Sequence, residues 1–457
     1  MNRTLASLPA AAAARGGAHA QAMLLGLGRH TITAALTTQG GQQRDWSADY
    51  RAYSAGRLDA GLIFRAILKE ALATLSDSQR IWLALDDSTL RKAGRKIPLT
   101  AWRRDPLSPP FAVNFQWGQR VLQACLLWKQ AGGGARGLPV AFDLLLNRPS
   151  KKERTRLDPG AVREAERQAN VNEAAVRQSQ RLAAAMARPV VAAVDGRFAN
   201  KTFLRRLPAH WSAVARIRKD AALFHPPASE GTTGRPRLYG LAAPRPQALR
   251  QDETHPWQTV RVHAAGRDHE MKIKTMSPLR SAMTGPTNGR LMVIAPLGYR
   301  LRAGGKLLYR QPAYLWVTDP QLSLQEAVQG YLWRWEEEVN FRDEKTLLGV
   351  GQAQVRHPES VARVPAWQVA AYSALLWCAQ NLGEPGMGAA LPRPKWRSKE
   401  PPLRTSTASL INQLRYDAWA SAIRPETLRG FWDETSPDQK PEKLNTSLPA
   451  AIFFATG

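Results

Sequence analysis

The sequence is poor in cysteine, in long hydrophobic runs and in acidic residues, and each scarcity excludes a class of protein. Only two cysteines occur among 457 residues, Cys125 and Cys378, and both lie within apolar sequence. This count excludes a disulfide framework and predicts two core cysteines. The eight histidines have no spacing to the cysteines that is typical of a zinc site. The chain is therefore expected to depend on a hydrophobic core for its stability.

No apolar run approaches the roughly 20 residues that a membrane-spanning helix needs. The longest candidate, residues 367–382, is interrupted by polar side chains and indicates a packed helix. The alanine-rich start, residues 8–14, is short and runs directly into an arginine and two glycines, unlike a secretion signal. We expect a cytoplasmic protein with no membrane partner.

The shortage of acidic residues leaves a large positive charge. Lysine and arginine number 64 against 37 aspartate and glutamate, a formal net charge of +27, and the pI is about 10.8. Residues 196–310 hold 21 lysine and arginine but 6 aspartate and glutamate, a net charge of +15. Such a bias favours a polyanionic partner, nucleic acid before membrane, because neutralised phosphates supply affinity that does not depend on sequence.

A stretch near the C-terminal third, residues 331–345 (YLWRWEEEVNFRDEK), is predicted to form one helix. At about 100° per residue, Tyr331, Arg334, Glu338 and Lys345 fall within roughly 60° of one another and form a stripe. Beside it, Leu332, Trp335 and Val339 have the spacing of a buried face, which would place Glu338 at the rim of a core. The remaining charged residues fit a solvated face: Glu336, Glu337, Arg342, Asp343 and Glu344.

Two further carboxylate positions follow short apolar runs that are typical of buried strands. Asp86 and Asp87 come directly after Ile81–Leu85, and Asp195 comes after residues 189–194. Buried carboxylates are costly unless they are paired, hydrogen-bonded or bound to metal. Taken singly, each motif also fits a turn or a helix cap. Their order along the chain, with one carboxylate after each of two buried strands and a third on a later helix, supports a shared site more than any single motif does.

The spacing Tyr-x2-Arg-x3-Glu-x6-Lys resembles the signature of the insertion-sequence-four type of bacterial DDE transposases. The resemblance implies that Glu338 is the third metal-binding carboxylate and Asp195 the second. We assign the first to Asp87 and keep Asp86 as the alternative. By the same resemblance Tyr331, Arg334 and Lys345 contact transposon-end DNA, and we add Arg356 as a further DNA contact.

The order of elements predicts an α/β fold. Strands at 81–85, 120–128 and 138–146 are close enough in sequence to be antiparallel neighbours, and a long helix at 159–187 precedes strands at 189–194 and 213–218. This order resembles an RNase H-like mixed sheet with flanking helices. Alternating runs between 259 and 318 predict a β-rich insertion. The family carries an insertion here, and Tyr314 or Trp316 would offer an aromatic ring to a flipped base, although both also fit buried strand positions.

We divide the chain into five regions. Residues 1–79 are helical and either bind DNA or support the catalytic domain, and the last region contains an amphipathic helix from Thr405 that serves dimerisation or packs within the same chain. The regions are 1–79, the helical N-terminal region; 80–218, the first part of the catalytic core; 219–318, the basic insertion; 319–384, the second part of the core; and 385–457, a basic linker, residues 392–402, and a helical region.

The expected activity is that of a transposase of a mobile genetic element, which cuts and joins DNA at the ends of its insertion sequence, by cut-and-paste. Three clustered carboxylates suit Mg²⁺ or Mn²⁺, and two ions are expected to assist in-line displacement at phosphorus. The expected partners are double-stranded DNA, both transposon ends and target, and a second copy of the chain, in the bacterial nucleoid. No nucleotide cofactor is expected, because the glycines at 349 and 351 lack the strand and helix that a phosphate loop requires. The alternatives are a nuclease that does not join strands and an inactive DNA-binding derivative.

Overall fold

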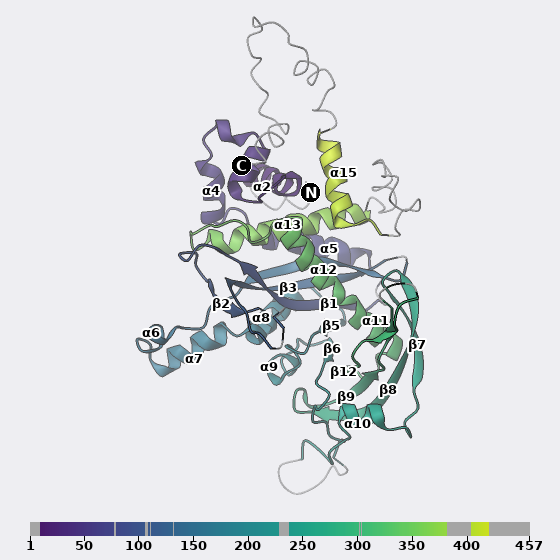
Figure 1. Cartoon of the computed structure of the whole chain (residues 1–457). Helices are drawn as coiled ribbons and strands as arrows, with labels where there is room; N and C mark the ends of the chain where they lie inside the picture. The colour runs from purple at the N-terminus through teal and green to yellow at the C-terminus, as the bar shows by residue number, and fades with distance from the viewer. Residues whose placement is uncertain are drawn as a thin grey trace, which may run out of the picture.

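The structure is a computed structural model of the chain (Figure 1). It describes residues 10–76, 79–105, 108–109, 111–130, 132–227, 237–300, 302, 304–381 and 404–419. The basic linker predicted at 392–402 and most of the last region lie outside these residues. Within the described part, no helix is both long enough and apolar enough to cross a membrane.

Helices occupy both ends of the described chain and the connections between strands. Their bounds are α2 Ala10–Leu25, α3 Ile32–Thr38, the 3₁₀ helix η1 Gly41–Gln43, α4 Ser47–Ser54, α5 Ala60–Thr74, α6 Lys151–Arg154, α7 Pro159–Gln168, α8 Val171–Ala183, α9 Lys201–Leu204, α10 Pro246–Gln251, α11 Leu324–Trp333, α12 Trp335–Thr346, α13 Ser360–Asn381 and α15 Thr407–Trp419.

Strands form one large sheet of ten strands and a separate two-stranded ribbon made by β10 and β11. Their bounds are β1 Ile81–Arg91, β2 Ala101–Arg104, β3 Phe115–Lys129, β4 Ala135–Leu144, β5 Val190–Val194, β6 Trp211–Arg216, β7 Gln258–Ala264, β8 Arg267–Ser281, β9 Gly285–Ile294, β10 Gly298–Tyr299, β11 Leu308–Tyr309 and β12 Ala313–Val317.

The centre of the large sheet has the order β4-β3-β1-β5-β6. β3 is antiparallel to both β1 and β4, whereas β5 runs parallel to β1 and β6 runs parallel to β5. These strands are buried on both faces, which fits their continuous runs of Val, Leu and Ala. The mixed α/β class is therefore confirmed, and the arrangement is consistent with an RNase H-like fold.

The strands of the basic segment continue this same sheet. β12 pairs antiparallel with β6 on one side and with β9 on the other, and β8 and β7 complete the edge. Trp316 in β12 is fully buried, and any side chain larger than hydrogen at Gly289 of β9 would collide with its indole ring. The segment thus lies side by side with the core rather than hanging from it (Figure 1).

Helices cover both faces of the central strands. In Figure 1, α12 and α13 lie above these strands and α8 and α9 lie below them. α12 packs on β1, β3 and β4, and α13 packs on β4 and on the N-terminal helices α2 and α5. The N-terminal helices therefore share the main core with the sheet, whatever they contribute to DNA binding.

The C-terminal helix α15 packs within the same chain. Its Leu410 and Ile411 are buried in the main core, and Arg415 donates hydrogen bonds to the carbonyl oxygens of Leu25 and Gly26 at the end of α2. Of the two uses expected for this helix, its apolar face serves packing in cis. Any contact with a second copy would have to use other surfaces.

Two local predictions differ from the structure. The helix expected over 159–187 is divided into α7 and α8, because the Asn170 side chain accepts a hydrogen bond from the Asn172 amide and begins a second helix. The edge strand β2 was not foreseen. Its four residues alternate between half-buried and exposed and carry two arginines, which is a weak strand pattern on its own.

Gly330 sets how closely α11 approaches β1. A Cβ atom built at this position would overlap the ring of Trp82. Alanine normally stabilises a helix relative to glycine, but here we expect Gly330→Ala to lower the free energy of unfolding by about 1–3 kcal/mol through overpacking. Urea denaturation of the variant measures this change.

Gly134→Ala is the matched control, because the nearest atom to its Cβ, on His263, lies 3.9 Å away. Equal stability of Gly330→Ala and the wild type would show that α11 does not pack against Trp82 as closely as described.

Candidate active site

Parallel pairing of β1 with β5 brings two aspartates together. Leu85 lies opposite Val194 in the register, so Asp86 and Asp195 follow at the same edge of the two strands. Burial raises the pKa of Asp86 to about 7, and the nearby charge of Asp195 contributes to the rise. These two carboxyl groups form the floor of the site.

Asp87, the residue assigned from the sequence, points to the opposite face of the sheet. Its carboxylate accepts a hydrogen bond from Arg120 Nε at 2.7 Å and pairs with Arg197 Nε at 2.9 Å. Successive side chains alternate across a strand, so Asp86 and Asp87 cannot both face Asp195. The structure thus brings Asp86, the alternative, to Asp195 and engages Asp87 in ion pairs elsewhere.

Glu338 reaches the site through Arg334. Arg334 Nη2 donates to Glu338 Oε1 at 2.8 Å, and Arg334 Nη1 lies 3.6 Å from Asp86 Oδ2. The guanidinium group therefore bridges carboxylates from β1 and α12. It also lies over the ring of Tyr331, 5.6 Å from its centroid. Among the described residues, no three His, Cys, Asp or Glu side chains are grouped closely enough to hold a metal ion.

Tyr331 and Lys345 flank the carboxylates. Burial raises the pKa of the Tyr331 hydroxyl group, and the charges near it belong to Arg334, Arg216 and Asp195. Lys345 Nζ donates to Ser88 Oγ, on the same face of β1 as Asp86. Burial lowers the pKa of Lys345. Of the predicted stripe, Tyr331 and Glu338 thus contact Arg334. Lys345 of α12 instead contacts β1 two residues beyond Asp86, at Ser88.

The stretch 331–345 is not one continuous helix, as was expected. α11 ends at Trp333 and α12 begins at Trp335. At the junction the Arg334 amide donates to Tyr331 O and the Glu337 amide donates to Arg334 O. These bonds span three residues instead of four, so the turn tightens at Arg334.

The buried side of α12 also differs from the prediction. Trp335, expected to be buried, is 60 % exposed, whereas Glu337, Asp343 and Glu344, expected to be solvated, are buried. The physical reason is a polar partner surface: Gln123 Nε2 of β3 donates to Glu344 Oε1 at 2.8 Å. Burial raises the pKa of Glu337 well above its ordinary value.

A large pocket opens beside Asp195. It has a volume of about 1040 Å³ and lies between the end of β6, α10 and the start of β12. Gly196 and Arg216 line it near Asp195, and Lys219 and Arg250 add positive charge. Tyr314 contributes to the wall, and its hydroxyl group donates to the side chain of Gln247.

The remaining predicted DNA contacts occupy three settings. Tyr314 is buried except where it lines the pocket, and Trp316 is fully buried, so the structure brings neither ring to the open surface. Arg356 is exposed in the connection between α12 and α13. Sequence reasoning missed Arg216, whose position after a buried strand, Ala213–Ala215, repeats the pattern used to find Asp195.

A comparison with known proteins identifies the family of the chain. A family model described as DDE superfamily endonuclease matches residues 4–277, more than half of the chain. The chain belongs to this family of DDE endonucleases, which act on DNA and generally use divalent metal ions. The matched segment includes Asp86 and Asp195 but ends before Glu338. None of the curated proteins matches the chain.

Glu344 offers a test of the buried polar surface beneath α12. Burial raises the pKa of Glu344 to about 8, although the hydrogen bond from Gln123 acts in the opposite direction and lowers it. The folded state therefore keeps a proton that the unfolded chain releases near pH 4.3. Between these values the folded protein binds more protons, so this contribution to stability is complete below about pH 4 and is lost as pH rises toward 8.

We expect Glu344→Gln to remove this pH dependence, because a neutral amide can still accept the hydrogen bond from Gln123. Urea denaturation at pH 5 to 9 should show the variant gaining stability relative to the wild type as pH rises. The control is Glu253→Gln at an exposed position, which should follow the wild type. A constant difference across this range would contradict burial of the Glu344 carboxyl group.

Proposed function

We propose that this protein is a transposase of the insertion-sequence-four type that binds the ends of its own element, cleaves the DNA and transfers the strands to a target. The observation that carries the proposal is that Asp86 of β1 faces Asp195 at the end of β5 and is linked through Arg334 to Glu338 of α12. We assign the catalytic carboxylates to these three residues. Asp86 replaces Asp87, which we assigned from the resemblance, as the first carboxylate.

The chemistry of the donor set suits a divalent metal ion, although among the described residues these carboxylates are not grouped closely enough to hold one without moving. All three side chains offer carboxylate oxygens, the ligands that Mg²⁺ and Mn²⁺ prefer. The site already accommodates a positive group, since the Arg334 guanidinium pairs with Asp86 and Glu338. When bound there, Mg²⁺ or Mn²⁺ would supply charge stabilisation at phosphorus during in-line displacement.

The chain's own residues would hold the DNA for this reaction. Arg334 and Lys345 are cations beside the carboxylates, and each can neutralise a phosphate next to the reacting one. Tyr331 lies against Arg334 and can donate to a phosphate oxygen. Hydrolysis with water would leave a 3′-hydroxyl group, and the same site would use that hydroxyl group to attack target DNA.

We further assign the pocket beside Asp195 to a nucleotide turned out of the DNA end. Its volume of about 1040 Å³ exceeds that of a single base, its wall includes Tyr314, and Arg216, Lys219 and Arg250 supply charge for a phosphate. In this proposal Tyr314 retains its role of contacting the base, with the part of its ring that lines the pocket. Trp316 supports the strand from beneath, as a fully buried residue.

The choice between Asp86 and Asp87 can be decided by strand cleavage. The substrate is DNA containing the flanking sequence of the gene, with Mg²⁺ or Mn²⁺ present. We expect Asp86→Asn and Glu338→Gln to reduce nicking by on the order of 100-fold or more, because charge stabilisation at the reacting phosphate is lost. Asp87→Asn should lose stability, through its two arginine partners, but retain nicking below its unfolding temperature.

Retention of nicking in Asp86→Asn with its loss in a folded Asp87→Asn would reverse the assignment. Wild-type protein that binds this DNA but neither nicks it nor joins its 3′ end to a target would contradict the transposase proposal. Nicking without joining would identify a nuclease.

Arg334 is expected to compete with the metal ion. Its positive charge lies within 4 Å of Asp86 and Glu338, so it opposes a second cation there. Without DNA, we expect Arg334→Gln to bind Mn²⁺ about tenfold more tightly than the wild type, measured by isothermal titration calorimetry. DNA cleavage by the same variant should fall, because a phosphate contact is lost.

Arg342→Gln is the matched control, since Arg342 is exposed on α12, the helix that begins directly after Arg334, and pairs with the neighbouring Asp343. Its Mn²⁺ affinity should equal that of the wild type. If Arg334→Gln leaves the affinity for Mn²⁺ unchanged, the guanidinium group does not occupy the metal position.

A further inference from the structure

The far end of the β2–β3 hairpin exposes a group of aromatic side chains. Trp102 of β2 is 56 % exposed and Phe115 of β3 is 62 % exposed. In the register, Trp102 lies opposite Trp117, and Arg104 lies opposite Phe115. Facing residues of antiparallel strands point to the same side of the sheet. We call Trp102, Trp117, Phe115 and Arg104, with Arg95 stacked on them, the hairpin platform.

The platform combines stacked rings with a cation. The two indole rings meet edge to face with their centroids 5.6 Å apart. The Arg95 guanidinium carbon lies 4.8 Å from the Trp102 centroid and 4.7 Å from that of Trp117. Trp117 Nε1 donates to Gly94 O at 3.2 Å, which fixes the loop that presents Arg95. The rings are thus held in place, with the exposed part of Trp102 facing solvent.

The platform lies on the same face of the sheet as the active site. Gln123 lies opposite Asp86 in the register and contacts Glu344 of α12. Trp117 is six residues earlier on the same strand, so it points to the same face, about 20 Å from Asp86 along β3. The α12–α13 connection continues this surface, because Lys92 Nζ donates to Gly351 O at 2.7 Å and Ala93 N donates to the Gln354 side chain at 3.1 Å.

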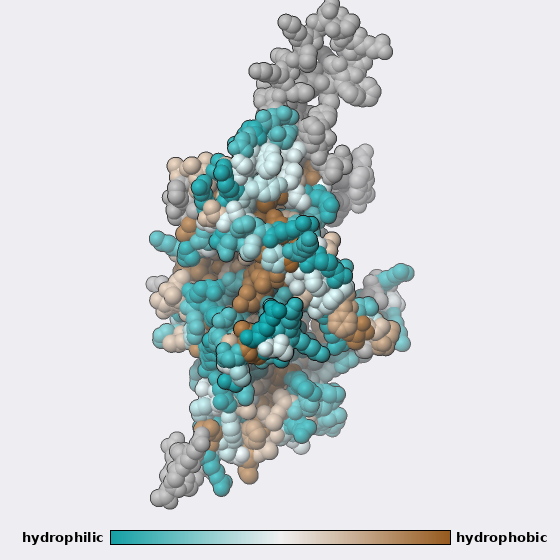
Figure 2. Space-filling view, turned by 90° about the vertical axis from the view of Figure 1, so that its left-hand side faces the viewer, coloured by the Kyte–Doolittle hydropathy of each residue, from teal (hydrophilic) through white to brown (hydrophobic). Residues whose placement is uncertain are grey.

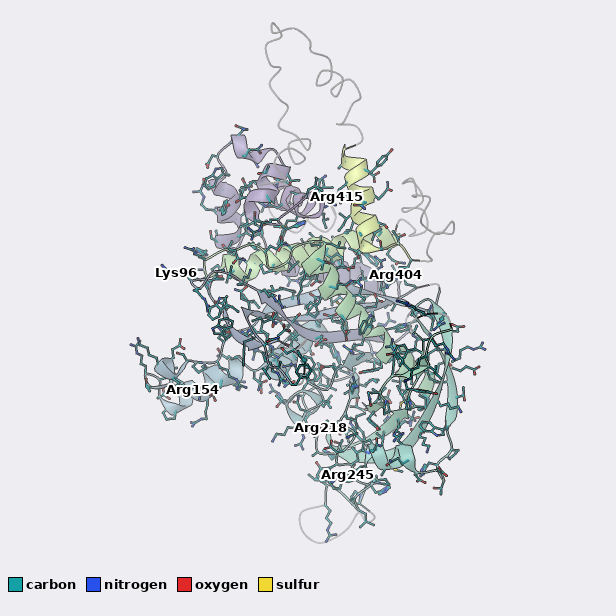
Figure 3. All side chains as sticks on the ribbon, in the orientation of Figure 1. Lys96, Arg154, Arg218, Arg245, Arg404 and Arg415 are labelled. Carbon is teal, nitrogen blue, oxygen red and sulfur yellow. The ribbon has the colours of Figure 1, made fainter. Side chains whose placement is uncertain are left out.

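Charge indicates the partner of this surface. Residues 91–105 contain six lysine and arginine against one acidic residue, Asp105, which pairs with Arg91 at 3.3 Å. Lys96 in this segment lies at the outer edge of the molecule, on the same side of the view as Arg154 (Figure 3). The face seen in Figure 2 is largely hydrophilic, with separate hydrophobic patches. Exposed rings within a cationic segment fit a nucleic acid that offers both phosphates and base faces.

We propose that the hairpin platform stacks unpaired bases of the DNA strand that lies next to the cleavage site. In a duplex the base faces are covered by their neighbours, so exposed rings gain contact only with bases that have been unpaired, whereas the arginines bind the backbone of either form. The proposal rests on the proposed function, because it concerns the DNA on which the same site acts. The platform would hold an opened strand about 20 Å from the carboxylates.

The test compares two fluorescent DNAs of one sequence, a blunt duplex and a duplex with a single-stranded overhang, by anisotropy without metal. We expect Trp102→Ala and Phe115→Ala each to weaken binding of the overhang DNA about fivefold to tenfold and to leave the blunt duplex unchanged, because stacking on one base is lost. Trp46→Ala, at an exposed Trp of the N-terminal helices with 52 % exposure, should change neither.

Equal weakening on both DNAs would show a contact with duplex only, and no weakening on either would show no DNA contact; both results overturn the proposal. A change in oligomeric state of Trp102→Ala on size-exclusion chromatography, with unchanged DNA binding, would assign the surface to a second copy. Circular dichroism confirms that each variant is folded. Binding is measured without metal, so failure of cleavage by the wild type would contradict the proposed function and leave this result intact.

Discussion

The site depends on the parallel pairing of β1 with β5. Because these two strands run in the same direction and in register, the residues that follow them meet at one edge, and Asp86 faces Asp195. Desolvation of Asp86 and the nearby charge of Asp195 both disfavour ionisation of the Asp86 carboxyl group, which is seen in its raised pKa. Arg334, at the α11–α12 junction, offsets this cost because its guanidinium group pairs with Asp86. The same group also pairs with Glu338 and so links this residue to the site.

Much of the fold could be predicted from the sequence, because its signals are local. Apolar runs bounded by polar residues located the five central strands, and the spacing between them separated antiparallel neighbours from the later parallel ones. The polar cap at Asn170 is equally local, but its effect depends on competition between one long helix and two short ones. β2 forms because it pairs with β3, and its own four residues have no strong strand preference. A pairing of this kind cannot be read from the local sequence.

The site was harder to predict, because it depends on which face each side chain takes. β1 is buried on both faces, and its apolar pattern therefore carries no information about whether Asp86 or Asp87 faces α12. The same difficulty affected α12, where hydrophobicity favoured burial of Trp335 but the sheet beneath presents Gln123 and Cys125 to Glu344 and Asn340. By contrast, the spacing from Tyr331 through Arg334 to Glu338 was readable, because Arg334 contacts both of the other residues even though α11 ends and α12 begins at Arg334.

The continuity of the sheet from β2 to β7 has a consequence of scale. Nine strands follow one another along this path, and at about 4.8 Å between neighbours they span about 38 Å. Duplex DNA rises 3.4 Å per base pair, so the same length corresponds to about eleven base pairs, close to one helical turn. Because neighbouring strands of a sheet are rotated by roughly 20° to 25° relative to one another, the edge at β2 faces a different direction from the edge at β7, with β1 and β5 between them.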